Sequence, residues 1–204
     1  GRFDANEQAV VPLRLDALRD AKFNIWPRNA GQAMVFDALL APAEEAPVVF
    51  IPGIYGTGKT FMACAAGLIQ TESDVYERIF ICPRDGALGK EIGFLPGDET
   101  AKTRAKSKPI EDNIREVLKT YKVDKQKGGK LPDDEKNLGR RIVLDKRVED
   151  TLFKYCEFEP LINMGGRSVS DSFMIYDEFQ EMERHQAKAL LTRIGEHSKV
   201  VIIG

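Results

Sequence analysis

Cysteine, histidine and tryptophan are scarce in this sequence, and their scarcity excludes several kinds of protein. The chain of 204 residues has three cysteines, two histidines and one tryptophan. Three widely spaced cysteines do not make a disulfide framework, so we interpret Cys64, Cys82 and Cys156 as reduced, buried thiols. His185 and His197 have no cysteine or second histidine at ligand spacing. We therefore do not expect a metal site built from protein ligands alone.

The sequence also lacks a long apolar run. No stretch approaches the roughly 18 residues of a membrane-spanning helix, and the first residues show no basic-then-apolar signal pattern. Hydrophobic residues make up 43% of the chain and charged residues 30%, which is typical of a soluble globular protein. A chain of this length holds one α/β domain and is too short for two of ordinary size. We expect a cytoplasmic protein that has no membrane partner.

The net charge of −2 shows that the chain as a whole is not a polycation. Residues 101–130 nevertheless hold ten Lys and Arg residues against four acidic residues, a local net charge of +6. Such a segment can contact the phosphates of a nucleic acid. It can equally be a solvated, mobile insertion, and the composition leaves both interpretations open.

The sequence does contain a complete phosphate-binding loop. Residues 53–60 read Gly-Ile-Tyr-Gly-Thr-Gly-Lys-Thr, which matches the pattern G-x-x-x-x-G-K-[ST]. In this motif backbone N–H groups surround a triphosphate, the lysine reaches the β- and γ-phosphates, and the threonine ligates Mg²⁺. An apolar run at 48–51 precedes the motif and a helical pattern at 61–66 follows it, which is the context the motif requires. The predicted nucleotide-binding residues of this segment are Gly53, Ile54, Tyr55, Gly56, Thr57, Gly58, Lys59, Thr60 and Phe61.

A second group of polar residues follows a later apolar run at 171–176. Asp177 can hold Mg²⁺ together with Thr60, and Glu178 can orient and deprotonate an attacking water, with Lys59 on the phosphates. Two acids at this place can also cap a helix N-terminus, but the phosphate loop earlier in the chain favours the catalytic interpretation. Gln180 is placed to hold the water or to sense the γ-phosphate, or it is a polar surface residue in a first helical turn.

Further candidates lie outside these two motifs. Gln32 stands at the start of a predicted helix, and a glutamine amide can read both N6 and N7 of adenine, which predicts ATP as the nucleotide. Asn29 is a second candidate for nucleotide binding, and Trp26 or Phe23 can stack on the base. Two arginines are candidates for phosphate sensing or coupling, or else form structural ion pairs: Arg167 and Arg193.

Strands alternate with helices along the chain, which predicts a parallel sheet with right-handed crossovers. We expect strands at 48–51, 78–82, 171–176 and 200–203, with another within 152–161. We expect helices at 31–40, from 61 onward, at 110–121 and at 181–194. Residues 1–22 are predicted to form an N-terminal helix or linker, and residues 83–108 a long loop.

Several segments together resemble the PhoH-like ATPases in order and approximate spacing. They are the phosphate loop 53–60, Glu-Ile-Gly-Phe-Leu-Pro-Gly-Asp at 91–98, Pro-Leu-Ile-Asn-Met-Gly-Gly-Arg at 160–167, Asp-Glu-Phe-Gln at 177–180 and Leu-Thr-Arg-Ile-Gly at 191–195. Residues 25–32 resemble the entry motif of that family, with Gln32 matching its adenine-reading glutamine. The resemblance covers residues 23–204, which we interpret as one ATPase domain with a basic, mobile insertion around 101–150.

This resemblance implies a three-layer RecA-like α/β core, similar to one motor domain of superfamily 1 helicases, that hydrolyses ATP with Mg²⁺. It also implies a link to RNA metabolism, ring-like homo-oligomers and, in some members, a PIN-type nuclease domain upstream. A shared fold raises the expectation of a role in RNA metabolism without establishing it.

The sequence departs from the family pattern in four places. The second strand ends Cys82-Pro83-Arg84 instead of Thr-Arg-Pro, and Phe179 replaces an alanine. Residues 119–150 have no counterpart that we can assign. The chain stops at Gly204, where the family continues. In this class of sheets the strand after the acidic motif lies between that motif's strand and the phosphate-loop strand, so a further edge strand is expected.

Two functions follow from these observations. The first is Mg²⁺-dependent ATP binding and hydrolysis coupled to remodelling of RNA or DNA, with tight nucleotide binding and slow intrinsic turnover. The alternative is a nucleotide-switched assembly module without nucleic-acid activity. A small-molecule kinase is disfavoured by the arrangement of residues 177–180 and by the lack of a recognisable phosphate-acceptor lid.

Overall fold

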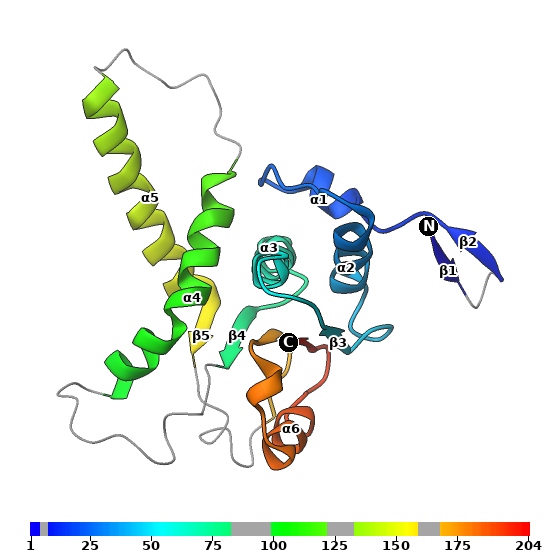
Figure 1. Ribbon diagram of the computed structural model, residues 1–204. Coiled ribbons are helices and arrows are strands. Elements are labelled where there is room, and N and C mark those ends of the chain that lie inside the picture. Colours follow the sequence, from blue (N-terminus) through cyan, green and yellow to red (C-terminus); the bar gives the residue numbers. More distant parts are fainter. Residues whose placement is uncertain (5–7, 83–98, 122–132, 159–167) are drawn as a thin grey trace.

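A five-stranded parallel sheet forms the centre of the computed structural model, with helices on both faces (Figure 1). The structure describes residues 1–4, 8–82, 99–121, 133–158 and 168–204. The strand order is β3-β7-β6-β4-β5, and every neighbouring pair is parallel. The strands are β3 (Val48–Ile51), β4 (Arg78–Cys82), β5 (Cys156–Phe158), β6 (Ser172–Tyr176) and β7 (Lys199–Ile203).

The position of β7 confirms the expected strand order. It lies between β6 and β3, with Val200 opposite both Val48 of β3 and Met174 of β6. Because all strands are parallel, the carboxyl ends of β3 and β6 lie at the same edge of the sheet. The phosphate loop follows β3 and the acidic pair follows β6, so the topology brings the two motifs to one edge.

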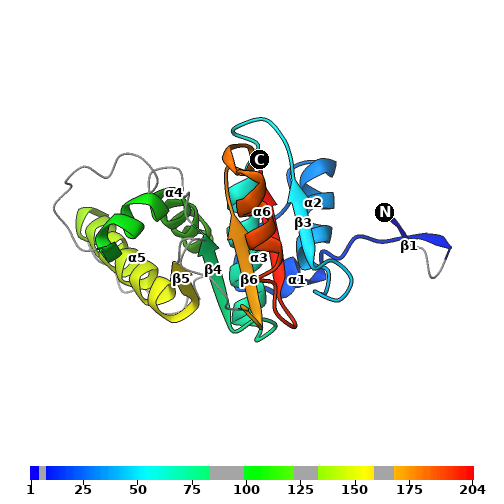
Figure 2. The ribbon, with the colours of Figure 1, turned by 90° about the horizontal axis from the view of Figure 1, so that it is seen from below.

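Helices cover the sheet unequally on its two faces. The larger core lies between the sheet and α2 (Ala30–Leu40), α3 (Lys59–Glu72) and α4 (Glu99–Lys119). The smaller core lies under α6 (Arg184–Leu191) and the short 3-10 turn η3 (Phe179–Glu181). Figure 2 shows α6 and α3 on opposite sides of β6. This three-layer α/β arrangement is that of a RecA-like P-loop fold, as the sequence predicts.

Helix α3 is buried from Met62 to Thr71, which explains its apolar, small-residue composition. It lies so close to the sheet that a side chain at Gly67 would approach the ring of Phe173 to 3.0 Å. Since helix α3 begins directly at the phosphate loop, this close packing fixes the loop against the sheet.

The N-terminal region differs from the predicted helix or linker. The strands β1 (Arg2–Asp4) and β2 (Ala9–Val11) pair antiparallel, and among the described residues of this region the helix is α1 (Asp16–Asp20). The β-branched residues of this segment, Val10 and Val11, are adjacent and favour a strand, and Pro12 removes a backbone donor just after β2. Within the predicted range 1–22, the helix is thus confined to Asp16–Asp20, and strands occupy described residues that precede Pro12.

Mobility of the insertion around 101–150 stays a prediction, but the structure shows helices there, including the one predicted at 110–121. The described part of the insertion consists of α4 and of α5 (Asp133–Tyr155), which lie side by side (Figure 1). Apolar side chains of both helices, including Ile114 and Val148, belong to the larger core. Helix α4 begins at residue 99, within the range expected to be a loop, and contains Pro109. Among the described residues no helix is long and apolar enough to cross a membrane.

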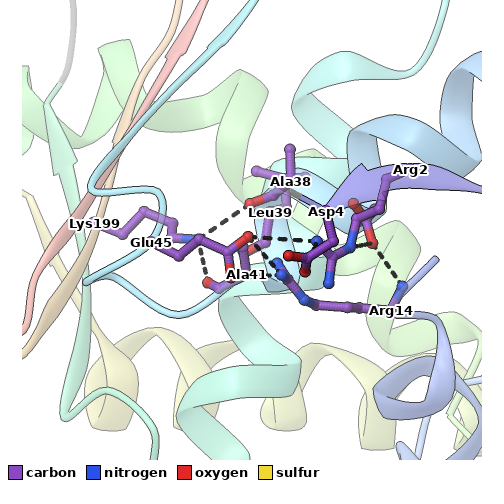
Figure 3. A network of polar contacts seen from close by, with 9 residues as sticks. Arg2, Asp4, Arg14, Ala38, Leu39, Ala41, Glu45 and Lys199 are labelled. Atoms are coloured by element: carbon purple, nitrogen blue, oxygen red, sulfur yellow. Dashed lines mark hydrogen bonds and ion pairs between the residues drawn. The ribbon is translucent and has the colours of Figure 1, made fainter. Parts of the chain in front are cut away.

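A buried lysine joins helix α2 to the sheet. The side chain of Lys199, at the start of β7, has no exposed surface, and its Nζ donates to the carbonyl oxygens of Ala38, Leu39 and Ala41 (Figure 3). These carbonyls are at the C-terminus of α2, where a positive charge is favourable and partners are needed. Burial, assisted by the nearby guanidinium of Arg14, lowers the pKa of Lys199 from 10.5 to about 8.

This buried lysine predicts a pH-dependent stability. Between pH 7 and pH 9 the unfolded chain keeps the Lys199 proton while the folded chain begins to lose it, so stability rises with pH. We expect the free energy of unfolding of the wild type to rise by about 1 kcal/mol relative to Lys199→Met over this window. Urea denaturation of both proteins at pH 7 and pH 9 measures these free energies of unfolding. The thiols of Cys64 and Cys156 are present in both proteins, so their contribution to the pH dependence cancels in the difference. Equal pH slopes in the two proteins would refute the assignment.

Candidate functional site

The phosphate-binding loop has the backbone that its glycines permit. Gly56 and Gly58 have φ angles of +78° and +86°, in the left-handed region that side chains disfavour. Gly58 is the N-cap of α3, so the first helical N–H groups follow it directly. Such a helix start presents N–H donors and a positive dipole end to an anion. The loop is therefore shaped for a phosphate group.

The side chain of Lys59 lies against the loop itself. Its Nζ donates to the carbonyl oxygens of Gly53 at 2.6 Å and Ile54 at 3.0 Å, and lies 5.7 Å from the ring centroid of Tyr55. A phosphate in the loop would compete with these carbonyls for the ammonium group. Because a phosphate carries full negative charge, a hydrogen bond from Lys59 to a phosphate would be stronger than its hydrogen bonds to the carbonyl oxygens.

Thr60 and Asp177 meet across the site although 117 residues separate them. The Thr60 hydroxyl donates to Oδ2 of Asp177 at 2.8 Å, and the backbone N–H of Glu178 donates to Oδ1 at 2.9 Å. Asp177 is half-buried, and this burial raises its pKa, while the hydrogen bond from Thr60 opposes the shift. The structure thus brings the two predicted metal ligands into direct contact.

These two residues fit a magnesium ion. A hydroxyl and a carboxylate are hard oxygen donors, and Mg²⁺ is bound by one or two such groups together with water and substrate phosphates. Among the described residues no group of three or more His, Cys, Asp or Glu side chains forms a metal site.

Glu178 lies between the phosphate loop and the turn η3. Its backbone is left-handed, with φ +63° and ψ +46°, a conformation that costs energy for a residue with a side chain. Its carboxylate accepts from the amide of Gln180 and lies 3.4 Å from the hydroxyl of Tyr55. The structure therefore brings the predicted base, the predicted glutamine and the loop together.

The residues around this arrangement line a pocket of about 210 Å³. Besides the phosphate loop and the acidic pair, its lining includes Asn113 of α4, together with Ile203 and Gly204 at the end of β7. We did not predict these three residues. Gly204 follows from the strand order, because β7 ends between the two motifs. Asn113 lies in the segment that we interpreted as an insertion, and no motif in the sequence marks it.

The upstream candidates lie near the loop but make contacts other than those we predicted. Gln32 donates from its amide to the carbonyl oxygen of Thr57 at 3.2 Å and accepts from the backbone N–H of Arg28 at 2.8 Å. Asn29 is the N-cap of α2 and accepts from the Gln32 backbone N–H. These contacts connect helix α2 to the phosphate loop. Adenine recognition by Gln32 stays a prediction.

The two aromatic candidates differ in their exposure. Trp26 is 51% exposed and is accessible to a base, whereas Phe23 is only 1% exposed. The ring of Phe23 packs edge-on against Tyr121 within the core. Base stacking by Phe23 is therefore a wrong prediction, because its apolar side chain gains more from burial than the sequence pattern reveals.

The structure does not bring Arg193 to the site. The carbonyl oxygen of Arg193 accepts from the N–H of Val169, and the N–H of Gly195 donates to the carbonyl oxygen of Val169. Val169 lies just before the amino end of β6. Asp177 follows the other end of this five-residue strand, which at about 3.3 Å per residue is more than 15 Å away. A side chain at Gly195 would meet the carbonyl of Val169 at 2.6 Å, so the glycine of this segment permits the close approach of the two chain segments. Arg167 and the segment 91–98 lie outside the described residues.

Comparison with known proteins gives a consistent result. The family model described as PhoH-like protein matches residues 24–204. Protein PhoH2 of Bacillus subtilis (strain 168) is 36% identical over 201 residues, which cover 98% of this chain and 40% of that protein. Protein PhoH2 of Thermobispora bispora is 31% identical over 182 residues, which cover 88% of this chain and 36% of that protein.

A PhoH-like protein of Mycobacterium tuberculosis (strain H37Rv) is 28% identical over 199 residues, covering 98% of this chain and 49% of that protein. The chain thus spans less than half the length of these curated relatives. The family match and the α/β fold with its phosphate-binding loop agree with each other. The chain belongs to the PhoH-like protein family, with the character of a nucleotide-binding P-loop NTPase.

Proposed function

We propose that this chain binds ATP with Mg²⁺ and hydrolyses it. The observation that carries the proposal is the contact of Thr60 with Asp177, which places a carboxylate base candidate, Glu178, beside a loop shaped for phosphate. A kinase does not need to activate water, whereas a second acid after the metal-binding aspartate suits hydrolysis.

Each group has a defined task in this proposal. The N–H groups at the start of α3 and the ammonium of Lys59 bind the β- and γ-phosphates. Thr60 and Asp177 hold Mg²⁺, which neutralises charge on the phosphates when it is bound. Glu178 accepts the proton of the attacking water, and Gln180 orients that water.

Phosphate release in the presence of Mg²⁺ or EDTA tests this proposal. We expect Mg²⁺-dependent release with a kcat below several per second, since among the described residues no arginine reaches the pocket lining to stabilise transition-state charge. Asp177→Asn is expected to raise the Mg²⁺ concentration needed for half-maximal activity at least tenfold, because it loses the metal's anionic ligand. Release that proceeds equally in EDTA would contradict the metal assignment.

We further propose that hydrolysis is coupled to single-stranded RNA or DNA. The support is the kinship of the fold with helicase motor domains and the excess of basic residues at 101–130. In the described part of α4, however, basic residues lie beside acidic ones, as in Lys108 with Asp112 and Arg115 with Asp145. These pairs reduce the positive field that a nucleic acid would meet.

Binding of a fluorescent single-stranded RNA at increasing salt tests this coupling. If the basic segment contacts phosphates, the affinity falls steeply with salt, by about tenfold or more between 50 and 200 mM. Adding RNA is then expected to raise the ATPase rate severalfold. An affinity that does not change with salt, or no binding at all, would remove nucleic acid from the proposal.

A second candidate function is nucleotide-dependent assembly, and one observation favours it. β3 is an edge strand in the described sheet, and its Val48 and Phe50 are exposed, Phe50 by 51%. An apolar edge strand of this kind is a surface that other chains can pair with. Phe50 also packs edge-on against Phe179 of η3, 5.2 Å between centroids, so the edge is in contact with the turn that follows the acidic pair. An oligomer mass that depends on ATP, with activity indifferent to RNA, would favour this function.

A further inference from the structure

Tyr55 is a loop position whose side chain the phosphate-binding motif does not specify. The motif allows any residue between its first two glycines, and the Tyr55 side chain is 79% exposed. An exposed ring gains little from burial, so packing does not explain its orientation. Its hydroxyl group nevertheless lies against polar groups from the opposite half of the site.

The hydroxyl of Tyr55 takes part in a closed set of three side chains. Its oxygen lies 3.4 Å from Oε2 of Glu178, to which it donates, and it accepts from Nε2 of Gln180 at 3.0 Å. The same Gln180 amide donates to Oε2 of Glu178. The three groups thus connect the loop after β3 with the turn after β6.

This connection addresses a requirement of the proposed chemistry. A general base works only when its carboxylate is held within hydrogen-bond reach of the water it deprotonates. A glutamate side chain has several rotatable bonds, and Glu178 lies in a turn whose backbone is already in a disfavoured conformation. Two donors on one carboxylate oxygen restrict its rotation and aim the other oxygen.

We propose that Tyr55 is a positioning residue, which holds the Glu178 carboxylate and the Gln180 amide against the phosphate loop. This role rests on the proposed function, since it presumes that Glu178 is the base. The tyrosine ring acts as a spacer and its hydroxyl as the contact, so phenylalanine at this position keeps the shape and loses the link.

Tyr55→Phe tests the proposal, with Tyr155→Phe as the matched control. Tyr155 also loses a hydroxyl that is hydrogen-bonded, to Lys154 on α5, but lies outside the pocket lining. Because the Tyr55 side chain is mostly exposed, its variant is expected to fold like the wild type. We expect kcat for ATP to fall about fivefold while KM stays within twofold, since the link acts on the base and not on ATP binding. Tyr155→Phe is expected to match the wild type.

A second measurement does not depend on turnover. Hydrogen exchange of the peptide covering residues 177–182, without added nucleotide, is expected to be about fivefold faster in Tyr55→Phe than in the wild type. Unchanged exchange in this peptide overturns the proposal, and so does a wild-type kcat or a change confined to KM. If the wild type releases no phosphate above a Lys59→Ala blank, the proposed function fails, and the exchange measurement still decides the role of Tyr55.

Discussion

Replacing Lys59 with alanine is expected to weaken ATP binding by about a hundredfold or more. In the structure the Lys59 ammonium lies within the loop, 2.6 Å from the carbonyl oxygen of Gly53, where phosphate oxygens would also be in reach. Each hydrogen bond from a charged donor is worth about 1.5–3 kcal/mol. Two such bonds to phosphates account for a hundredfold change, since about 1.4 kcal/mol corresponds to a factor of ten.

Titration with a fluorescent ATP analogue measures this change directly. Lys188→Ala, which removes an exposed lysine from α6, is the matched control and is expected to bind like the wild type. Thermal melting of both variants without nucleotide shows whether the fold is intact. A dissociation constant for Lys59→Ala within threefold of the wild-type value would show that the loop does not bind the phosphates as proposed.

Replacing Glu178 with glutamine is expected to lower kcat by a factor of about 10²–10⁴, the usual contribution of a general base. The substitution keeps the size of the side chain and its ability to accept from Gln180, but glutamine cannot take a proton. ATP affinity is expected to stay within a few-fold of the wild type, because Glu178 does not bind the phosphates. The variant should therefore retain intact ATP.

Single-turnover hydrolysis, followed by separation of bound ATP from ADP, distinguishes this outcome. Glu196→Gln serves as the control, because Glu196 is an exposed acid near the amino end of β7, away from the pocket. If Glu178→Gln hydrolyses ATP at the wild-type rate, Glu178 is not the base. In that case hydrolysis would proceed without Glu178 as the base, and Asp177 and the phosphates alone would position the attacking water.

The sequence predicts the centre of this fold well because two strong patterns lie there. The run Val48–Ile51 before a glycine-rich loop has few alternatives to a strand, although the run does not reveal that Val48 and Phe50 stay exposed at the sheet edge. Residues 171–176 before two acids are as clear a strand. The topology then follows from physical rules, since parallel strands put both motifs at one sheet edge. The contact of Thr60 with Asp177 is the direct result.

The parts that the sequence did not predict depend on tertiary contacts. Phe23 and Trp26 are both aromatic residues in an extended segment, yet only Phe23 finds Tyr121 as a partner and becomes buried. The helix predicted at 110–121 is confirmed by α4, but the polar composition of α5 suggested a solvated segment, and a few apolar residues such as Val148 suffice to dock this helix. The Tyr55 contact could not be predicted because its position in the motif accepts any residue.

One measurement tests the central claim most directly, namely steady-state phosphate release by this chain with ATP and Mg²⁺, with and without single-stranded RNA. Lys59→Ala provides the blank for contaminating activity. We predict slow release by the wild type that clearly exceeds the blank and that rises when RNA is added. Wild-type release equal to the Lys59→Ala blank under both conditions would contradict the assignment of this site as an ATPase.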